Sequence, residues 1–188
     1  MMRHIICNLF AVALLLALPI DVNAQSTTKD TTTIPKWHKK LSPDSVAIED
    51  IRKAAENGDV DAQYELGFRY NIGSRVPQDF DQCAYWFEKA AKQGDAVSQM
   101  MYGVCLFNGQ GVKQDYEKAF YWTRKSAEQG YPTGQLVLGY NYLDGHGVER
   151  DKKQAAYWFK QAADQGNQQA KDELEKLEKK KKRRVGSE

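Results

Sequence analysis

Apolar residues recur at the spacing of an amphipathic helix from residue 45 to residue 178, and the whole pattern repeats every 36 residues. The repetition predicts three full units, at residues 59–94, 95–130 and 131–166, with a half unit at each end. Identical residues occupy the same place in each unit, which is typical of repeat proteins. The repeated positions include Gly67, Gly103 and Gly139 in one column and Trp86, Trp122 and Trp158 in another.

Each unit is predicted to contain two helices joined by a glycine-rich turn. In the first unit, one helix lies near residues 61–72 and the second follows Asp79, a residue suited to the N-cap position. The second helix ends before Gly94, because glycine adopts the left-handed backbone that closes a helix. Gly67 lies inside the first helix, where glycine costs about 1 kcal/mol relative to alanine. Its repetition therefore predicts that the two helices of a unit cross closely there.

The last half unit differs from the others because its outer face is charged. One pair of short helices cannot bury its apolar face, but stacked pairs bury a continuous core. Ala170 and Leu174 continue the apolar pattern within a segment that is otherwise rich in lysine and glutamate, as a capping helix requires. The predicted fold class is all-α: an α/α solenoid of 36-residue helix-turn-helix repeats wound as a right-handed superhelix.

Three motifs recur in order: LG-x-x-Y, then G-x-G-V-x-x-D, then K-A-x-x-W-x-x-K-A-A-x-Q-G. They resemble the Sel1-like repeat family, a relative of the tetratricopeptide repeats, and the resemblance covers residues 46–178. The resemblance implies an α/α solenoid that binds other proteins as an adaptor, including in bacterial envelope and host-interaction processes. The first unit departs from the motif, because Arg75 stands where the later units have Gly111 and Gly147. That departure predicts a reshaped turn.

The first 24 residues have the pattern of a signal peptide. Arg3 precedes an apolar run at residues 5–20, which is shorter than the roughly 20 residues that span a bilayer, and small residues follow at 22–24. Residues 25–44 are polar and predict a flexible leader. We therefore expect an exported protein, in the periplasm or secreted, without stable membrane insertion.

The charge of the chain is uneven although its net value is only +2. This small net charge does not indicate nucleic acid as a partner. Residues 179–184 read KKKKRR, so residues 179–188 predict a basic, disordered tail that keeps the end of the capping helix soluble. An alternative function for the tail is a tether that binds anionic lipid or polymer.

Residues that could carry catalysis are few. The histidines, His4, His38 and His146, are scattered, so the sequence predicts neither a metal site nor a cofactor. Ser26 and Lys29 match the S-x-x-K form of penicillin-binding enzymes, but no K-T-G or S-D-N motif accompanies them. Cysteine-rich relatives in the family have been linked to penicillin binding, which leaves a hydrolase of β-lactam or cell-wall substrates as the alternative. The sequence favours a protein that is not an enzyme.

Two cysteines lie within the repeats and form a candidate disulfide. Cys83 belongs to the second helix of one unit, and Cys105 belongs to the first helix of the next. They lie at similar distances on either side of the turn at 94–95, so they should face each other across an antiparallel helix pair. A disulfide and two independent buried thiols are both compatible with this spacing.

A second apolar stripe on the first helices is the predicted partner-binding surface. By analogy with tetratricopeptide repeats it lines a concave groove, although neighbouring units could instead bury it as core. Its residues are Tyr64, Phe68, Asn71, Met100, Val104, Phe107, Leu136, Tyr140 and Leu143. Grooves of this kind bind an extended peptide or a helix. We expect a monomeric, non-enzymatic scaffold that binds a peptide or helix of an envelope or host protein.

Overall fold

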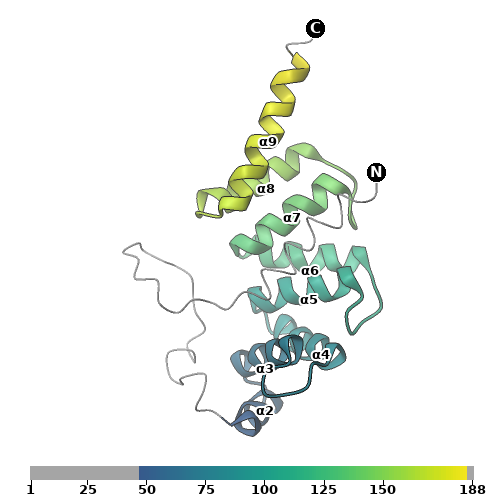
Figure 1. Cartoon of the computed structure of the whole chain (residues 1–188), viewed down its shortest axis with the longest axis vertical. Helices are drawn as coiled ribbons and strands as arrows, with labels where there is room; N and C mark the ends of the chain where they lie inside the picture. Colours follow the sequence, from purple (N-terminus) through teal and green to yellow (C-terminus); the bar gives the residue numbers. More distant parts are fainter. Residues whose placement is uncertain (1–46, 186–188) are drawn as a thin grey trace. The chain divides into compact units, whose positions relative to one another are not determined.

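The computed structural model describes residues 47–185, and this part of the chain is helical without any strand (Figure 1). The helices are α2 (Ile48–Glu56), α3 (Val60–Ile72), α4 (Phe80–Lys92), α5 (Ala96–Asn108), α6 (Tyr116–Glu128), α7 (Pro132–Asp144), α8 (Lys152–Asp164) and α9 (Gln168–Val185). The predicted all-α class is therefore confirmed. The predicted signal peptide and leader lie outside the described residues.

Each helix packs against the helices that precede and follow it along the chain, which produces a stack of helix pairs (Figure 1). The three full units are α3–α4, α5–α6 and α7–α8, and α2 and α9 are the half units at the ends. The first helices of neighbouring units also approach each other directly at α5 and α7. The predicted α/α solenoid is thus confirmed.

Aspartate and glycine set the ends of the helices. Asp79 precedes α4, and its carboxylate accepts a hydrogen bond from the backbone N–H of Gln82 at 3.0 Å. Asp115 and Asp151 cap α6 and α8 in the same way. Gly73 closes α3 with a left-handed backbone at φ 70°. Because these residues satisfy polar groups that a helix end leaves open, the helices begin and end where the sequence predicts.

The glycines inside the first helices allow the two helices of each unit to cross closely, as predicted. A Cβ atom placed on Gly139 would lie 2.5 Å from ring carbons of Phe159, a residue that is fully buried. A Cβ on Gly67 would lie 2.9 Å from the Phe87 ring. No real Cβ contact is this short, so a larger side chain at either position would push the two helices apart.

The turn of the first unit keeps its shape, although Arg75 predicted a reshaped one. Arg75 has φ 61°, close to the values of 67° at Gly111 and 70° at Gly147. The later units need glycine for another reason, which is contact with the preceding unit. A Cβ on Gly111 would collide with the carbonyl oxygen of Phe80, and one on Gly147 with that of Tyr116. The position that matches Phe80 one unit earlier is residue 44, which lies outside the described residues.

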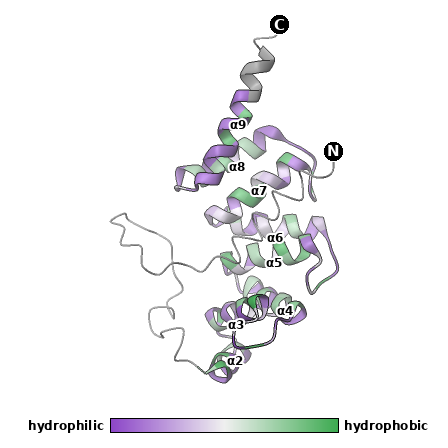
Figure 2. Ribbon diagram, in the orientation of Figure 1, coloured by the Kyte–Doolittle hydropathy of each residue, from purple (hydrophilic) through white to green (hydrophobic). Residues whose placement is uncertain are grey.

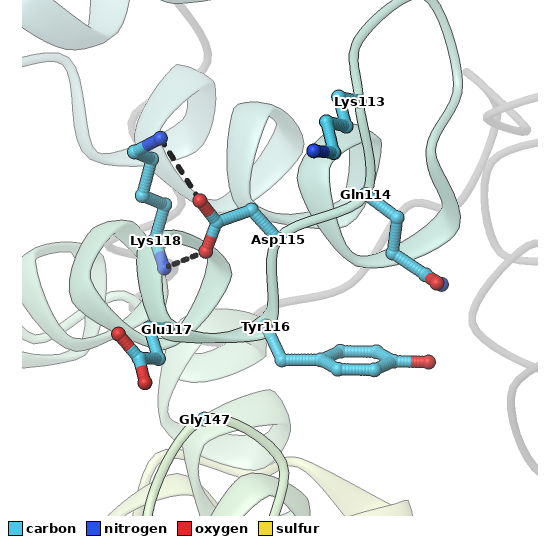
Figure 3. A pocket seen from close by; sticks show the side chains of 7 residues that line it. All are labelled: Lys113, Gln114, Asp115, Tyr116, Glu117, Lys118 and Gly147. Atoms are coloured by element: carbon cyan, nitrogen blue, oxygen red, sulfur yellow. Dashed lines mark hydrogen bonds and ion pairs between the residues drawn. The ribbon is translucent and has the colours of Figure 1, made fainter.

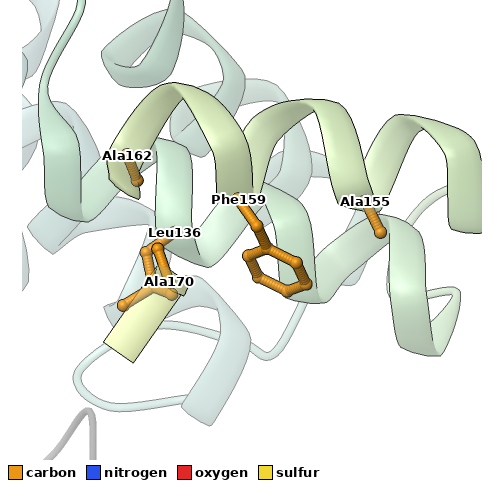
Figure 4. Close-up of a cluster of buried hydrophobic side chains, with 5 residues drawn as sticks. All are labelled: Leu136, Ala155, Phe159, Ala162 and Ala170. Carbon is orange, nitrogen blue, oxygen red and sulfur yellow. The ribbon is translucent and has the colours of Figure 1, made fainter. Parts of the chain in front are cut away.

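The capping helix covers the apolar end of the last unit. Ala170 is fully buried and joins a core cluster made of Leu136, Ala155, Phe159 and Ala162 (Figure 4). Leu174 and Leu177 pack against the same cluster and are partly buried. Figure 2 shows hydrophobic residues on α5, in the middle of the stack, and mainly hydrophilic residues on α9 at its end. The charged half unit therefore acts as the predicted cap.

Helix α9 continues to Val185, whereas the sequence predicted a disordered tail from residue 179. Lysine and glutamate both have high helix propensity. Lys179 is paired with Glu175 at 3.4 Å, one helical turn away. Basic residues are also favourable at the carbonyl end of a helix, because that end carries partial negative charge. The basic run therefore extends the helix instead of ending it.

Candidate functional site

The nine residues of the predicted binding stripe divide into two groups. Met100, Val104 and Leu136 are buried, with exposed fractions of 3%, 8% and 1%. They belong to the core and offer almost no surface to a partner. The other six stay partly exposed on α3, α5 and α7. We call these six residues the inner face: Tyr64, Phe68, Asn71, Phe107, Tyr140 and Leu143.

At the first unit, the inner face begins with a pair of aromatic rings. The rings of Tyr64 and Phe68 stack with centroids 6.3 Å apart and planes inclined by 20°. The Tyr64 ring also lies 5.9 Å from Phe87, which belongs to the core. Burial raises the pKa of the Tyr64 hydroxyl, so that group stays neutral over the ordinary pH range. Tyr64 thus holds Phe68 against the core while Phe68 remains partly exposed.

In the middle, Phe107 joins an aromatic cluster that links two units. Its ring lies 5.0 Å from Tyr116 at the start of α6 and 5.0 Å from His146 in the turn after α7. Tyr116 and His146 are themselves 5.6 Å apart. Burial lowers the pKa of the His146 imidazole, so the neutral ring is the favoured form near pH 7. The cluster fixes the orientation of Phe107.

A shallow polar hollow of about 580 Å³ lies beside this cluster (Figure 3). Lys113, Gln114, Asp115, Tyr116, Glu117, Lys118 and Gly147 line it. The Asp115 carboxylate accepts a hydrogen bond from the backbone N–H of Lys118 at 2.9 Å and pairs with the Lys118 ammonium at 2.9 Å. The backbone hydrogen bond is the main reason that the pKa of Asp115 is lowered. This carboxylate therefore caps α6, and the hollow contains no nucleophile paired with a base.

At the last unit, Tyr140 connects the inner face with the capping helix. Its ring lies 5.2 Å from the buried Phe159, and its hydroxyl accepts a hydrogen bond from Gln169 Nε2 at 3.2 Å. Burial raises the pKa of Tyr140 to about 12. Because Gln169 belongs to α9, the capping helix helps to hold Tyr140 of the inner face in place.

The three helix pairs of the stack each match a known repeat. Sel1 repeats are found at residues 60–95, 96–131 and 132–167, one residue later than the predicted boundaries. The chain belongs to the Sel1 repeat family. Sel1 repeat proteins are generally scaffolds for protein interaction, and their fold is typically not enzymatic. No curated protein matches the sequence as a relative.

Solved structures of other Sel1 repeat proteins are similar to this one. A protective antigen present in uropathogenic Escherichia coli strains, which displays an SLR fold, is 42% identical with a TM-score of 0.66 over 68% of this chain. The aligned part is only 27% of that antigen. A Sel1 repeat protein from Oxalobacter formigenes is 36% identical with a TM-score of 0.62, over 69% of this chain and 97% of that one. Helicobacter pylori cysteine rich protein B is 26% identical with a TM-score of 0.55, over 69% and 98%.

A ladder of glutamine amides joins successive Sel1 repeats, and the sequence analysed by itself did not predict it. Gln129 Nε2 donates to the carbonyl of Gly94 at 2.9 Å and to Gln99 Oε1 at 2.7 Å. Gln99 Nε2 in turn donates to the carbonyl of Ala91. Gln93 and Gln165 make the same pairs of bonds at the other repeats. The signal in the sequence that could have revealed this ladder is the glutamine that precedes the closing glycine of each second helix and recurs every 36 residues.

A buried ion pair distinguishes the first Sel1 repeat. Arg69 Nε donates to Glu65 Oε1 at 2.6 Å, and both side chains are at most 9% exposed. The matching positions of the next repeat hold Met101 and Cys105, which are uncharged. Breaking a buried pair is costly because it leaves one charge without compensation. This pair is structural and lies on the buried side of α3.

The two cysteines of the Sel1 repeats lie together, as predicted. Cys83 on α4 and Cys105 on α5 are both buried free thiols. A hydrogen bond with Cys105 is the main cause that raises the pKa of Cys83, and burial adds to it. The disulfide itself stays a prediction, because the structure shows the cysteines as thiols.

The second helices present a separate row of exposed tyrosines. Tyr85, Tyr121 and Tyr157 are 45%, 49% and 52% exposed and recur every 36 residues. Each tyrosine ring packs in a T-shaped arrangement against the tryptophan that follows it in the chain, with ring centroids about 5 Å apart. Of these tryptophans, Trp86 is buried, and Trp122 and Trp158 are partly buried. The row offers an exposed surface that differs from the inner face.

Neither a metal site nor a membrane-spanning helix is found in the described part of the Sel1 repeat protein. Residues 47–185 contain no group of three or more His, Cys, Asp or Glu that could hold a metal ion. Within the same residues, no helix is both long enough and apolar enough to cross a membrane. Ser26 and Lys29, on which the hydrolase alternative rests, lie outside the described residues, as do His4 and His38.

Proposed function

We propose that this Sel1 repeat protein is an exported, non-enzymatic scaffold that binds a peptide or a helix of another protein along the inner face. The observation that supports this function is the row of partly exposed aromatic rings on the first helices of all three repeats. Tyr64 and Phe68 belong to the first repeat, Phe107 to the second and Tyr140 to the third. Large apolar side chains that remain exposed on one face commonly mark a binding surface.

The contacts beneath the inner face favour binding because they hold its rings in place. Phe107 packs against Tyr116 and His146, and Tyr140 packs against Phe159. Rings that are already ordered lose little conformational entropy when a partner binds. Asn71 and the Tyr140 hydroxyl add polar groups that can pair with the backbone of an extended peptide. The inner face thus combines aromatic anchors with polar groups, as peptide-binding grooves do.

Site-specific photocrosslinking tests the proposed surface. A photoreactive phenylalanine analogue would replace Phe68 or Phe107 on the inner face, and Tyr121 or Tyr157 on the second helices as matched controls. Crosslinking is carried out in cells that produce the protein naturally, and the products are identified by mass spectrometry. We expect the two inner positions to capture the same protein and the control positions to capture none. Capture only from the control positions would contradict the proposal.

The captured protein then permits a quantitative test. Phe68→Ala should weaken its binding to the purified Sel1 repeat protein at least tenfold, because a few aromatic anchors carry a large part of the binding free energy. Tyr157→Ala removes a ring of similar size from the other face and should leave the affinity unchanged. Circular dichroism of both variants checks that the helices are retained. Equal losses in both variants would mean that the binding surface lies elsewhere.

A second candidate function is a tether that acts through the basic end of α9. The supporting observation is that residues 179–184 continue a helix away from the core cluster, which places six basic residues on one short segment (Figure 1). Deleting residues 179–184 should abolish salt-sensitive binding to anionic vesicles and leave binding at the inner face intact. Vesicle binding that survives the deletion would exclude the tether.

Export to the periplasm, or secretion from the cell, is part of the proposal and rests on the pattern of residues 1–24. Fractionation of the source cells, with antibodies against the repeats, tests it. N-terminal sequencing of the recovered protein should begin at Gln25 if the pattern is a cleaved signal peptide. Recovery of the intact N-terminus in the cytoplasmic fraction would contradict export.

A further inference from the structure

Cys83 and Cys105 lie opposite each other at the boundary between the first two Sel1 repeats. Cys83 precedes Gly94 by as many residues as Cys105 follows it, so both occupy the same level of the antiparallel pair α4–α5. Their exposed fractions are 0% and 5%, and their thiols are hydrogen-bonded neighbours. The two sulfur atoms therefore lie next to each other inside the contact between α4 and α5.

The cysteine pair occurs at this repeat boundary and does not recur at the next one. At the next boundary, between α6 and α7, the matching positions hold Ala119 and Asn141. Ala119 shows that a smaller residue without sulfur fits the position of Cys83. Packing by itself therefore does not require two cysteines here. We propose that Cys83 and Cys105 form an intramolecular disulfide that joins the first Sel1 repeat to the second.

The bond forms by thiol–disulfide exchange with a small or protein disulfide, such as oxidised glutathione. One cysteine thiolate attacks the oxidant and releases a first thiol, which leaves a mixed disulfide. The second cysteine thiolate then attacks that mixed disulfide and releases a second thiol. Cys83 and Cys105 each lose a proton and together two electrons, which reduce the oxidant disulfide to two thiols. The Sγ–Sγ bond replaces the bond broken in the oxidant.

Burial dictates when this reaction can occur. The folded stack excludes the oxidant from Cys83, and the hydrogen bond with Cys105, together with burial, raises the pKa of that thiol and keeps it in its unreactive protonated form. Exchange therefore takes place while the α4–α5 pair is still open, during folding or local unfolding. Once the bond exists, the same burial protects it from reduction. The disulfide then holds α4 against α5 and fixes the distance between the first and second repeats.

Refolding with and without oxidant tests the proposal. The full chain with Cys7→Ser, so that no third thiol competes, is unfolded under reducing conditions and refolded in a glutathione redox buffer. We expect a monomer in which neither cysteine reacts with an alkylating reagent after unfolding. Peptide mapping should recover Cys83 linked to Cys105. Two alkylated cysteines, or disulfide-linked dimers, would overturn the proposal.

Thermal stability shows whether the bond fits the native stack. The oxidised protein should melt about 5–10 °C above its reduced form, given the usual worth of a disulfide that closes a loop of this length. The matched control is Cys83→Ala, which copies the residue of the next two repeats and should melt at the same temperature in both buffers. A bond that forms but leaves the melting temperature unchanged or lower would also overturn the proposal, because it would require a distorted α4–α5 pair.

Discussion

Single residues in this protein show that one backbone conformation can arise for two different reasons. Arg75, Gly111 and Gly147 all have left-handed φ values near 65°. A non-glycine residue in this region costs about 1–3 kcal/mol, and the first repeat tolerates that cost. The later repeats must have glycine because a Cβ would collide with the backbone of the preceding repeat. The sequence showed where the glycines are but not this contact, because the two residues that make it lie 31 positions apart in neighbouring repeats.

Gly147→Ala should destabilise the protein strongly, because the new Cβ meets the carbonyl oxygen of Tyr116, a backbone atom that cannot move independently of α6. We expect a loss of about 3 kcal/mol or more in the free energy of unfolding, measured by chemical denaturation. Arg75→Ala is the matched control, since a Cβ is already present at that turn. A smaller loss for Gly147→Ala than for Arg75→Ala would show that contact between repeats does not impose the glycine.

His146 should make stability depend on pH in a window below its ordinary pKa. Its pKa is lowered in the folded protein, mainly by burial, although Asp144 opposes the shift and Arg150 adds to it. The unfolded chain therefore takes up the proton first as the pH falls below about 6.5, and protonation favours unfolding. The stabilising contribution of the neutral ring is complete above that pH and declines below it.

The His146→Phe variant isolates this effect, because phenylalanine keeps a ring against Phe107 and Tyr116 but cannot titrate. We expect the melting temperature of the unaltered protein to fall more between pH 7.5 and pH 5 than that of the variant. Thermal denaturation followed by circular dichroism measures both. Identical pH profiles would indicate that His146 titrates normally.

At the scale of the helices, the sequence predicted boundaries better than it predicted burial. Capping aspartates and closing glycines lie within one or two residues of the helix ends they determine, so their effect is local. Burial of the stripe is different, since Val104 occupies the position that matches Phe68 one repeat earlier but only Val104 is buried. The period of the pattern treats the two positions alike, so it cannot reveal this difference in burial. Tertiary packing therefore decided which three of the nine stripe residues are buried.

The amide ladder should contribute measurably to the contact between helices of successive repeats. Gln129→Ala removes the donor that satisfies the buried Gln99 Oε1 and the carbonyl of Gly94. We expect a loss of about 1–3 kcal/mol, the usual result of leaving a buried polar group without its partner. Chemical denaturation measures the loss. Gln154→Ala is the control, because Gln154 is exposed on α8 and its replacement should change stability little. Equal stability of both variants would argue against the ladder.

For the whole molecule, stability comes from contacts between neighbouring repeats, as expected for a solenoid. Helix α9 has no repeat after it, and it covers the core cluster around Leu136 and Phe159 through Ala170. Its further length, to Val185, extends beyond that contact as a charged helix. The two parts of α9 should therefore differ in their importance for folding.

Truncation separates these two parts. A chain that ends at Asn167 loses the whole of α9 and exposes the cluster, so α8 should lose protection from hydrogen exchange and the melting temperature should fall markedly. A chain that ends at Glu178 keeps Ala170, Leu174 and Leu177 and should melt close to the full chain. Similar melting of both truncated chains would show that the last repeat does not need its cap.

The sequence by itself determined the repeat, its length, the helix pair within it, the caps and the family. These features are encoded by residues close together in the chain and repeated three times, so chance cannot easily imitate them. Only the tertiary structure decided which stripe residues stay exposed, why Arg75 is accepted, and that Gln129 reaches Gly94 and Gln99. Those outcomes depend on contacts between residues about 30 or more positions apart, which become neighbours only when the repeats stack.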